Sequence, residues 1–287
     1  MVLATSVAWI ALTGIGMVPP SLMYALAGGL LVAAVGFIDD RIKVSPAVRL
    51  VVHLGAALWA VVWLGGLPPV RIAGETLQLG WAGSALAVLG IAWTLNLFNF
   101  MDGIDGIAAS EAVFVGFGAA LLTLPDGKSV QVASVGLVLG AASAGFLLWN
   151  WPPAKIFMGD VGSGYLGYVI GVLGLVAGRG NSAALWVWLI LGGVFFVDAT
   201  VTLLRRILRG DRVYEAHRSH AYQWLARRWR SHRSVTIAVT AVNLFWLLPC
   251  AWLATRYPAL GAWITLLALT PVTMAAFAAG AGRRENE

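Results

Sequence analysis

The sequence predicts an all-α, polytopic membrane protein, a bundle of about ten transmembrane helices, and its composition supports that fold class. Of the 287 residues, 60% are hydrophobic and only 11% are charged, whereas about 25% of the residues of a soluble protein are charged. A soluble globule of this size could not cover its surface with so few charges, and a disordered chain would need low hydrophobicity. We therefore expect one integral membrane domain over residues 1–287.

Ten apolar runs, each bounded by charged residues, proline or glycine, have lengths suited to a bilayer, whose core needs about 20 residues per helix. The runs that we predict as spans are 2–18, 22–38, 47–65, 81–98, 107–124, 130–149, 161–178, 183–204, 234–254 and 258–281. The fifth and seventh runs begin inside polar motifs, so their starts carry the weakest hydropathy signal.

The basic residues predict which ends of the spans face the cytoplasm. The even-numbered gaps and the C-terminal tail hold most of the 19 Lys and Arg residues, and the odd-numbered gaps hold only Arg71, Lys128, Arg179 and Arg256. Because basic loops stay in the cytoplasm, we place the even-numbered gaps there. Such loops explain the net charge of +6 without a nucleic-acid partner. Within the basic loop 205–233, residues 220–230 are expected to form an amphipathic helix at the lipid surface.

The first acidic motif in these gaps is the pair Asp39-Asp40, which follows Gly36-Phe37-Ile38 at a predicted helix end. Adjacent carboxylates repel each other unless a cation or a proton lies between them. A hard cation such as Mg²⁺, which takes oxygen ligands, suits such a pair. The alternative is a polar helix end that pairs with a nearby Lys or Arg.

The second motif contains Asn96, Asn99, Asp102 and Asp105, with a glycine after each aspartate. The last three of these side chains are three residues apart, so they would share one face if the segment were helical. The glycines would let the backbone approach a ligand closely. The alternative is a glycine-rich loop that Asn and Asp cap.

The third motif contains Lys155, Phe157 and Asp160 among prolines and glycines. Lysine is a point charge suited to phosphate, and phenylalanine can stack on a base. The alternative is a turn in which Asp160 is a helix N-cap. A fourth motif, His217-Arg218-Ser219-His220, suits a metal pair, a proton shuttle or simple interfacial polarity.

Asp198, in the eighth span, is unusual because a carboxylate inside a membrane segment is costly. It is expected either to face the interior of the bundle or to pair with a basic residue at the lipid interface. The sequence leaves both readings open.

Taken in order, the four motifs resemble those of the polyprenyl-phosphate N-acetylhexosamine-1-phosphate transferases, glycosyltransferase family 4. The likeness is carried by Phe-Ile-Asp-Asp-x-x-Lys, Asn-Phe-Met-Asp-Gly-Ile-Asp-Gly and Lys-Ile-Phe-Met-Gly-Asp-Val-Gly-Ser. The version His-Arg-Ser-His-Ala-Tyr-Gln is most similar to the branch that initiates O-antigen or capsule synthesis. Relatives usually begin with another span and a Pro-Thr-Pro-x-Gly-Gly-like loop, and we expect this chain to lack both.

The resemblance implies transfer of an N-acetylamino-sugar 1-phosphate from a UDP-sugar to a polyprenyl phosphate, usually undecaprenyl phosphate. It implies a site on the cytoplasmic face of the bacterial inner membrane, a role in lipopolysaccharide or cell-wall synthesis, and Mg²⁺ as cofactor with Mn²⁺ as an alternative. The resemblance leaves open whether the protein forms a homodimer. The residues matched are Asp39, Asp40, Asp102, Asp105, His217 and His220 as catalytic, Lys43, Asn96, Asn99, Lys155, Phe157 and Arg218 as substrate-binding, and Asp102 and Asp160 as metal-binding.

Two mechanisms and three functional classes remain at this point. Transfer between phosphates needs charge neutralisation more than covalent help, so we favour direct attack by the lipid phosphate over a covalent aspartyl intermediate. A secondary transporter would instead need a polar path at the bilayer midplane, and most of the acids lie at span ends. A catalytically inactive homologue that acts as an assembly protein is the third class.

Overall fold

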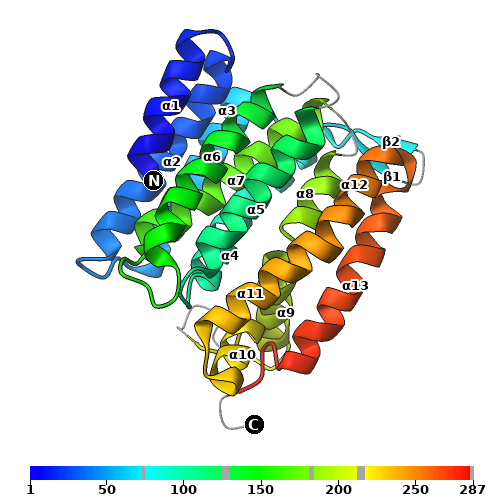
Figure 1. Cartoon of the computed structure of the whole chain (residues 1–287). Coiled ribbons are helices and arrows are strands. Elements are labelled where there is room, and N and C mark those ends of the chain that lie inside the picture. The colour runs from blue at the N-terminus through cyan, green and yellow to red at the C-terminus, as the bar shows by residue number, and fades with distance from the viewer. Residues whose placement is uncertain (73–74, 125–129, 181–183, 212–216, 285–287) are drawn as a thin grey trace.

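The computed structural model describes residues 1–72, 75–124, 130–180, 184–211 and 217–284, and these residues form an all-α membrane bundle (Figure 1). Lys128 and part of the basic loop, 212–216, lie outside the described residues. The elements in chain order are α1 (Val2–Gly14), α2 (Pro20–Asp39), α3 (Pro46–Leu64), β1 (Val70–Ile72), β2 (Glu75–Leu77), α4 (Gly80–Met101), α5 (Ile107–Thr123), α6 (Val130–Asn150), α7 (Gly159–Gly180), α8 (Ala184–Leu191), α9 (Gly193–Leu208), α10 (Ala221–Trp229), α11 (His232–Val242), η2 (Asn243–Leu247), α12 (Leu248–Arg256), η3 (Pro258–Leu260) and α13 (Gly261–Ala279).

All ten predicted spans coincide with helices, which confirms the fold class, but fewer of them are full-length than predicted. In the part of the chain that the structure describes, seven helices are long and apolar enough to cross a membrane, or eight if the bent pair α8 and α9 is one span. The helices α1 and α5 are apolar but contain only 13 and 17 residues. Hydropathy alone had extended both of them into the neighbouring loops.

The eighth predicted span is not one straight helix. It breaks between α8 and α9, whose axes are bent by 74°. The break lies at Gly192-Gly193, and paired glycines are a recognised cause of sharp helix kinks. A Cβ on Gly193 would lie 2.7 Å from Leu269 Cδ2 of α13, so a larger residue at this position would have to displace that side chain.

Two further features of the connections bear on the sequence predictions. The strands β1 and β2, which the sequence analysis did not predict, form an antiparallel hairpin at the opposite end of the bundle from α10 (Figure 1). The helix expected within residues 220–230 is confirmed as α10, which carries Arg227 and Arg228 in its last turn.

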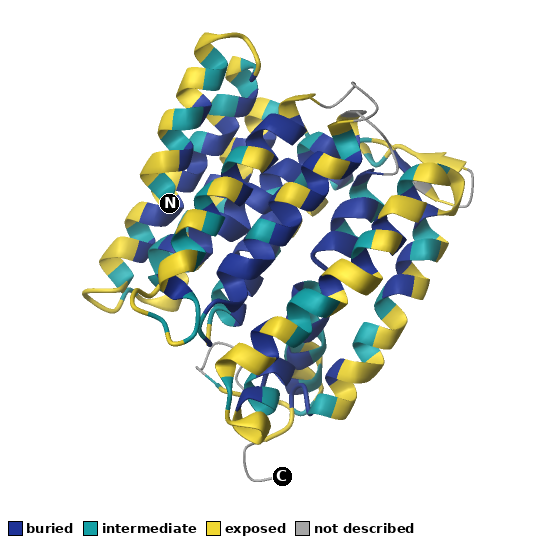
Figure 2. Ribbon diagram, viewed as in Figure 1, coloured by how far each residue is buried: buried dark blue, intermediate teal, exposed yellow. Residues whose placement is uncertain are grey.

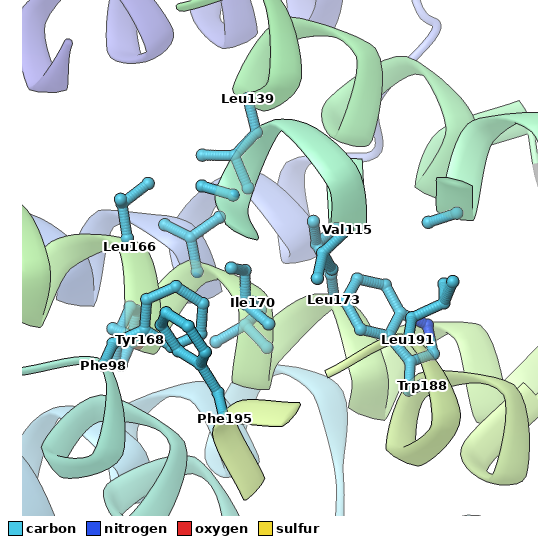
Figure 3. Close-up of a cluster of buried hydrophobic side chains, with 14 of the residues drawn as sticks. Phe98, Val115, Leu139, Leu166, Tyr168, Ile170, Leu173, Trp188, Leu191 and Phe195 are labelled. Carbon is cyan, nitrogen blue, oxygen red and sulfur yellow. The ribbon is translucent and has the colours of Figure 1, made fainter. Parts of the chain in front are cut away.

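The centre of the bundle is α7. It is the most enclosed of the long helices, with 89% of its apolar window buried inside the protein (Figure 2). Its side chains Tyr168, Ile170 and Leu173 belong to one buried apolar cluster with Phe98 of α4 and Phe195 of α9 (Figure 3). Because α7 carries Asp160 in its first turn, the most enclosed of the long helices fixes the position of that acid.

The contact between α2 and α7 leads to a prediction on stability. A Cβ on Gly36 would lie 2.5 Å from the backbone C and O of Asp160, so Gly36→Ala must push the two helices apart. We expect a loss of about 1–3 kcal/mol in unfolding free energy, measured as a lower thermal midpoint in detergent. The matched control is Gly55→Ala on α3, where a Cβ would meet nothing within 4 Å. Equal midpoints for the two variants would contradict this prediction.

Candidate active site

The Asp39-Asp40 motif lies where α2 ends, and its two carboxylates point in different directions. Asp39 Oδ1 accepts a hydrogen bond from the backbone N–H of Val44 (2.6 Å), and its Oδ2 accepts one from Nη1 of Arg49 (2.6 Å). Asp40 Oδ1 instead accepts a hydrogen bond from the backbone N–H of Asp160 (3.0 Å). The pair therefore connects the end of α2 to both α3 and α7.

Arg49 reaches this point because α3 begins at Pro46, three residues before it. The Ser45 side chain caps α3, and Pro46 occupies its first turn, as is favourable at a helix N-terminus. Nη1 of Arg49 lies 2.6 Å from Asp39 Oδ2 and 3.3 Å from Asp160 Oδ2. One guanidinium group thus balances carboxylates from two separate motifs.

Asp160 connects the first and third motifs to the second. Its Oδ1 accepts a hydrogen bond from Nδ2 of Asn99 on α4 (2.7 Å), and the same amide lies 3.1 Å from Ser163 Oγ on α7. Asp160 lies within the first turn of α7 rather than before it, so the alternative reading as an N-cap is wrong. Its side chain binds groups of neighbouring helices instead.

Asp102 follows directly after α4. Burial, reinforced by the negative charges of Asp160 and Asp40, raises the pKa of the Asp102 carboxyl to about 8. Asp102 therefore carries a proton at neutral pH when no cation is close to it. The shift also places acids of the first three motifs near enough to one another for their charges to interact.

Asp105 points away from this acidic group. Its Oδ2 accepts a hydrogen bond from the backbone N–H of Ala154 (3.2 Å), and its Oδ1 lies 3.4 Å from His232 Nδ1. Its backbone carbonyl accepts a hydrogen bond from Thr236 of α11 (3.0 Å). Asp105 thus joins the second motif to the Pro152-Pro153 loop of the third motif and to α11.

The histidine motif stacks over the end of α4. The rings of His217 and His220 are 5.0 Å apart, and the His220 ring is 6.1 Å from that of Phe100. Burial, aided by the charges of His220 and Arg206, lowers the pKa of His217 to about 4. The His217 ring is therefore neutral near pH 7, with Nδ1 2.9 Å from Ser219 Oγ.

A cavity of about 530 Å³ opens between these groups. Its wall combines residues of α2, α3, α4 and α7 with the histidine motif, and the predicted site residues that line it are Asn96, Asn99, Asp160, His217 and His220. Arg49 and His53 of α3 line it as well. The wall therefore offers both carboxylate and cationic groups to a ligand, as the binding of a phosphate and a metal ion together would require.

Four of the predicted substrate-binding residues lie on the surface instead. Lys43 and Arg218 are exposed, and 78% of Phe157 is exposed. Lys155 is exposed and lies over the ring of Trp149 at 5.5 Å. None of these four side chains lines the cavity.

The sequence analysis missed Arg49 and left Asp198 open. Arg49 had counted only as a basic residue of a cytoplasmic loop, although a single arginine at the start of an apolar helix, ten residues after an acid pair, was an available signal. Asp198 faces the interior: it is 3% exposed, and its carboxylate accepts hydrogen bonds from the backbone N–H groups of Ala221 and Tyr222, directly after the histidine motif. Pairing with a basic residue at the lipid interface is therefore excluded as its role.

The donor set fits a hard divalent cation in its chemistry. Asp40, Asp102 and Asp160 offer only oxygen atoms, which Mg²⁺ prefers, and the mutual repulsion that raises the pKa of Asp102 is what a cation would relieve. Among the described residues, no three His, Cys, Asp or Glu side chains are already placed as a coordination group. Binding an ion would therefore require these carboxylates to turn toward one another.

Comparison with known proteins identifies related chains. The model of the family described as "Glycosyl transferase family 4" matches residues 22–178. The chain is 34% identical to the "probable undecaprenyl-phosphate N-acetylglucosaminyl 1-phosphate transferase" of Bacillus subtilis, over 75% of this chain and 61% of the relative. It is 31% identical to a phospho-N-acetylmuramoyl-pentapeptide-transferase of Moorella thermoacetica, over 66% and 63%.

A third relative is named for a different lipid carrier, decaprenyl phosphate. The chain is 29% identical to the decaprenyl-phosphate N-acetylglucosaminephosphotransferase of Mycobacterium leprae, over 75% of this chain and 60% of the relative. These matches therefore span about 60% of the length of the curated relatives. The matched family region contains the first three motifs and ends before the histidine motif.

Proposed function

Since this chain belongs to glycosyl transferase family 4, we propose that it transfers an N-acetylamino-sugar 1-phosphate from a UDP-sugar to polyprenyl phosphate, releasing UMP. The observation that carries the proposal is the meeting of separate acidic and histidine motifs around one cavity at one end of a membrane bundle. A water-soluble nucleotide sugar and a membrane lipid can both reach such a place. The names of the relatives support a polyprenyl phosphate acceptor and N-acetylglucosamine as the first sugar to test.

The reaction joins two anions, so the site must offset their repulsion. An oxygen of the lipid phosphate attacks the phosphorus that bears the sugar, and the bond from that phosphorus to the UMP oxygen breaks. Arg49 supplies a positive charge on the cavity wall. There it stabilises the negative charge of the phosphoryl group, which would otherwise repel the attacking lipid phosphate. Asp39 holds Arg49 in place through the contact of 2.6 Å.

The acids are assigned to the lipid phosphate and the metal ion. Asp40 is tied to the start of α7, and its proposed role is to hold or accept the proton of the lipid phosphate, whose second pKa is about 6. Bound Mg²⁺, held by Asp102 and Asp160, would supply further neutralisation of the phosphates. Because the acceptor is already largely anionic at neutral pH, direct attack needs no covalent aspartyl intermediate.

The polysaccharide that the product initiates and the location of the site are proposed from the histidine motif and the basic loops. The spacing His217-x-x-His220 supports the branch that starts O-antigen or capsule repeats, and the basic loops support a cytoplasmic site in a bacterial inner membrane. The test is to give purified protein undecaprenyl phosphate and each UDP-N-acetylhexosamine in turn and to identify the lipid product. The product shows which amino sugar is transferred and whether it suits the proposed branch of the family.

The proposed reaction is tested directly by UMP release. Purified protein in detergent with undecaprenyl phosphate and UDP-N-acetylglucosamine should release UMP only when Mg²⁺ or Mn²⁺ is present, and chelation by EDTA should stop it. Omission of the lipid is the control, because the phosphate acceptor is needed for bond cleavage. UMP release that does not depend on the lipid, or no release with any UDP-N-acetylhexosamine, contradicts the proposal.

The raised pKa of Asp102 predicts the pH dependence of metal binding. Below its pKa of about 8 a proton competes with the cation for this carboxyl, so the affinity for Mg²⁺ should rise by up to about tenfold per pH unit and level off above pH 8. Titration of Mg²⁺ against the thermal midpoint between pH 6 and 9 measures it. In Asp102→Asn this pH dependence should weaken. A flat affinity in the unaltered protein between pH 6 and 8 would refute the assignment.

A further inference from the structure

Asp198 is a buried carboxylate that the proposed reaction does not use. Its Oδ1 accepts hydrogen bonds from the backbone N–H of Ala221 (2.8 Å) and from Thr202 Oγ1 (3.2 Å), and its Oδ2 accepts one from the N–H of Tyr222 (3.0 Å). Ala221 and Tyr222 are the first two residues of α10. A side chain of α9 thus satisfies backbone donors that the start of a helix leaves unpaired.

The same carboxylate sets the state of the His220 ring. Nδ1 of His220 lies 3.3 Å from Asp198 Oδ1, and an ionised carboxylate can only accept a hydrogen bond, so Nδ1 must carry the proton. In a neutral imidazole Nε2 is then a bare acceptor. His220 is 3% exposed and lines the cavity, so its ring presents an acceptor where the substrates would lie.

Asp198 also places Tyr222 against the second motif. The Tyr222 hydroxyl donates a hydrogen bond to the carbonyl oxygen of Phe100 (2.9 Å), two residues before Asp102. The same hydroxyl occupies the space that a side chain at position 103 would need, which explains the glycine there. Asp198, Tyr222 and Phe100 therefore form a continuous connection from α9 to the turn that carries Asp102.

We propose that Asp198 is a positioning residue that holds His220 with Nδ1 protonated and Nε2 available in the cavity, and that seats Tyr222 against the Asp102 turn. The part of this inference that concerns turnover rests on the proposed function. Outer partners of this kind, which orient an active histidine, typically change activity by about 10- to 100-fold when they are replaced. The rings of Phe100 and His217 lie 6.1 and 5.0 Å from the His220 ring; they pack against it but leave the choice of tautomer to Asp198.

A kinetic comparison tests the role in turnover. Asp198→Asn should lower kcat by about 10- to 100-fold, while KM for the UDP-sugar changes by less than about threefold. The matched control Thr202→Val removes one bond to the same oxygen without touching the histidine motif, and it should keep kcat within about threefold of the unaltered protein. Asp198→Glu, which keeps both acceptor oxygens, should recover part of the loss.

A double-mutant cycle separates positioning from general destabilisation. If Asp198 acts through His220, Asp198→Asn combined with His220→Ala should lower kcat little more than His220→Ala does alone. Losses that multiply in the double variant would overturn the proposal. The thermal midpoint of each purified variant is measured alongside. A merely structural role for Asp198 would lower the midpoint, and the kcat losses of the two single variants would then multiply in the double variant.

The tautomer itself is measured by ¹⁵N nuclear magnetic resonance of histidine-labelled protein, with His220→Ala used to assign the signal. The unaltered protein should show a protonated Nδ1 and a bare Nε2 at His220, and Asp198→Asn should shift the population toward a protonated Nε2. A protonated Nε2 in the unaltered protein would overturn the proposal without any variant having to fold. This measurement needs no turnover, so it decides the role of Asp198 even if the UMP-release assay contradicts the proposed reaction.

Discussion

Asp160→Asn is expected to lower kcat/KM for UMP release by about 10³-fold or more, because it removes a charge that Asn99 of α4 and Arg49 of α3 both contact. Asp160 accepts hydrogen bonds from Asn99 and Arg49, and its backbone N–H binds Asp40. The substitution keeps the shape of the side chain and one acceptor oxygen. Its effect should therefore lie in weaker binding of the metal ion that would neutralise the phosphates, and not in folding.

The control for this variant is another carboxylate at the same end of the bundle. Asp211 pairs with Arg284 (2.8 Å) and Arg209 (3.2 Å) and does not line the cavity. Asp211→Asn should leave kcat/KM within about threefold of the unaltered protein. UMP release at the unaltered rate by well-folded Asp160→Asn, judged by its thermal midpoint, would remove Asp160 from the site.

Arg49→Ala is expected to lower kcat/KM by about 10²-fold or more, because the cavity wall loses a positive charge that phosphate needs. The same change leaves the carboxylates of Asp39 and Asp160 without their shared partner. Both contacts come from the single nitrogen Nη1, so one ammonium group could replace them. Arg49→Lys should therefore retain activity within about tenfold of the unaltered protein.

Arg41→Ala is the matched control for Arg49. Arg41 belongs to the loop that precedes α3, is exposed and lies over the ring of Phe37, 3.5 Å from its centroid. Its removal should change kcat/KM by less than about threefold. Steady-state UMP release at varied UDP-sugar and lipid concentrations measures all three variants. Equal losses in Arg41→Ala and Arg49→Ala would show that only the overall charge of this face matters.

Much of the fold was predictable because a bilayer makes hydropathy nearly decisive. Each apolar run became a helix, and the motifs stayed at helix ends, where polar groups meet water. Hydropathy does not register backbone geometry inside an apolar run, so the bend of 74° at Gly192 was missed. The hairpin β1–β2 was missed because two three-residue strands produce too short an alternation to recognise.

The sequence by itself determined the class of protein and its helices, and it supplied the residues that are proposed for the chemistry. Only the tertiary structure decided how those residues divide among tasks. Asp39 and Asp40 are neighbours in sequence, yet one binds Arg49 and the other binds the start of α7. Asp105 repeats the spacing of Asp102, yet it faces the Pro152-Pro153 loop.

The physical reason is the distance along the chain between interacting groups. Asp160 and Asn99 are 61 residues apart, and Asp160 and Arg49 are 111 residues apart. Hydropathy and motif spacing report only on neighbours within a few turns of one helix. Pairings across the bundle depend on how helices pack. Glycines such as Gly36 permit close packing, since a Cβ there would lie 2.5 Å from the Asp160 backbone on α7. The assembly of the cavity is therefore a property of the packed helices.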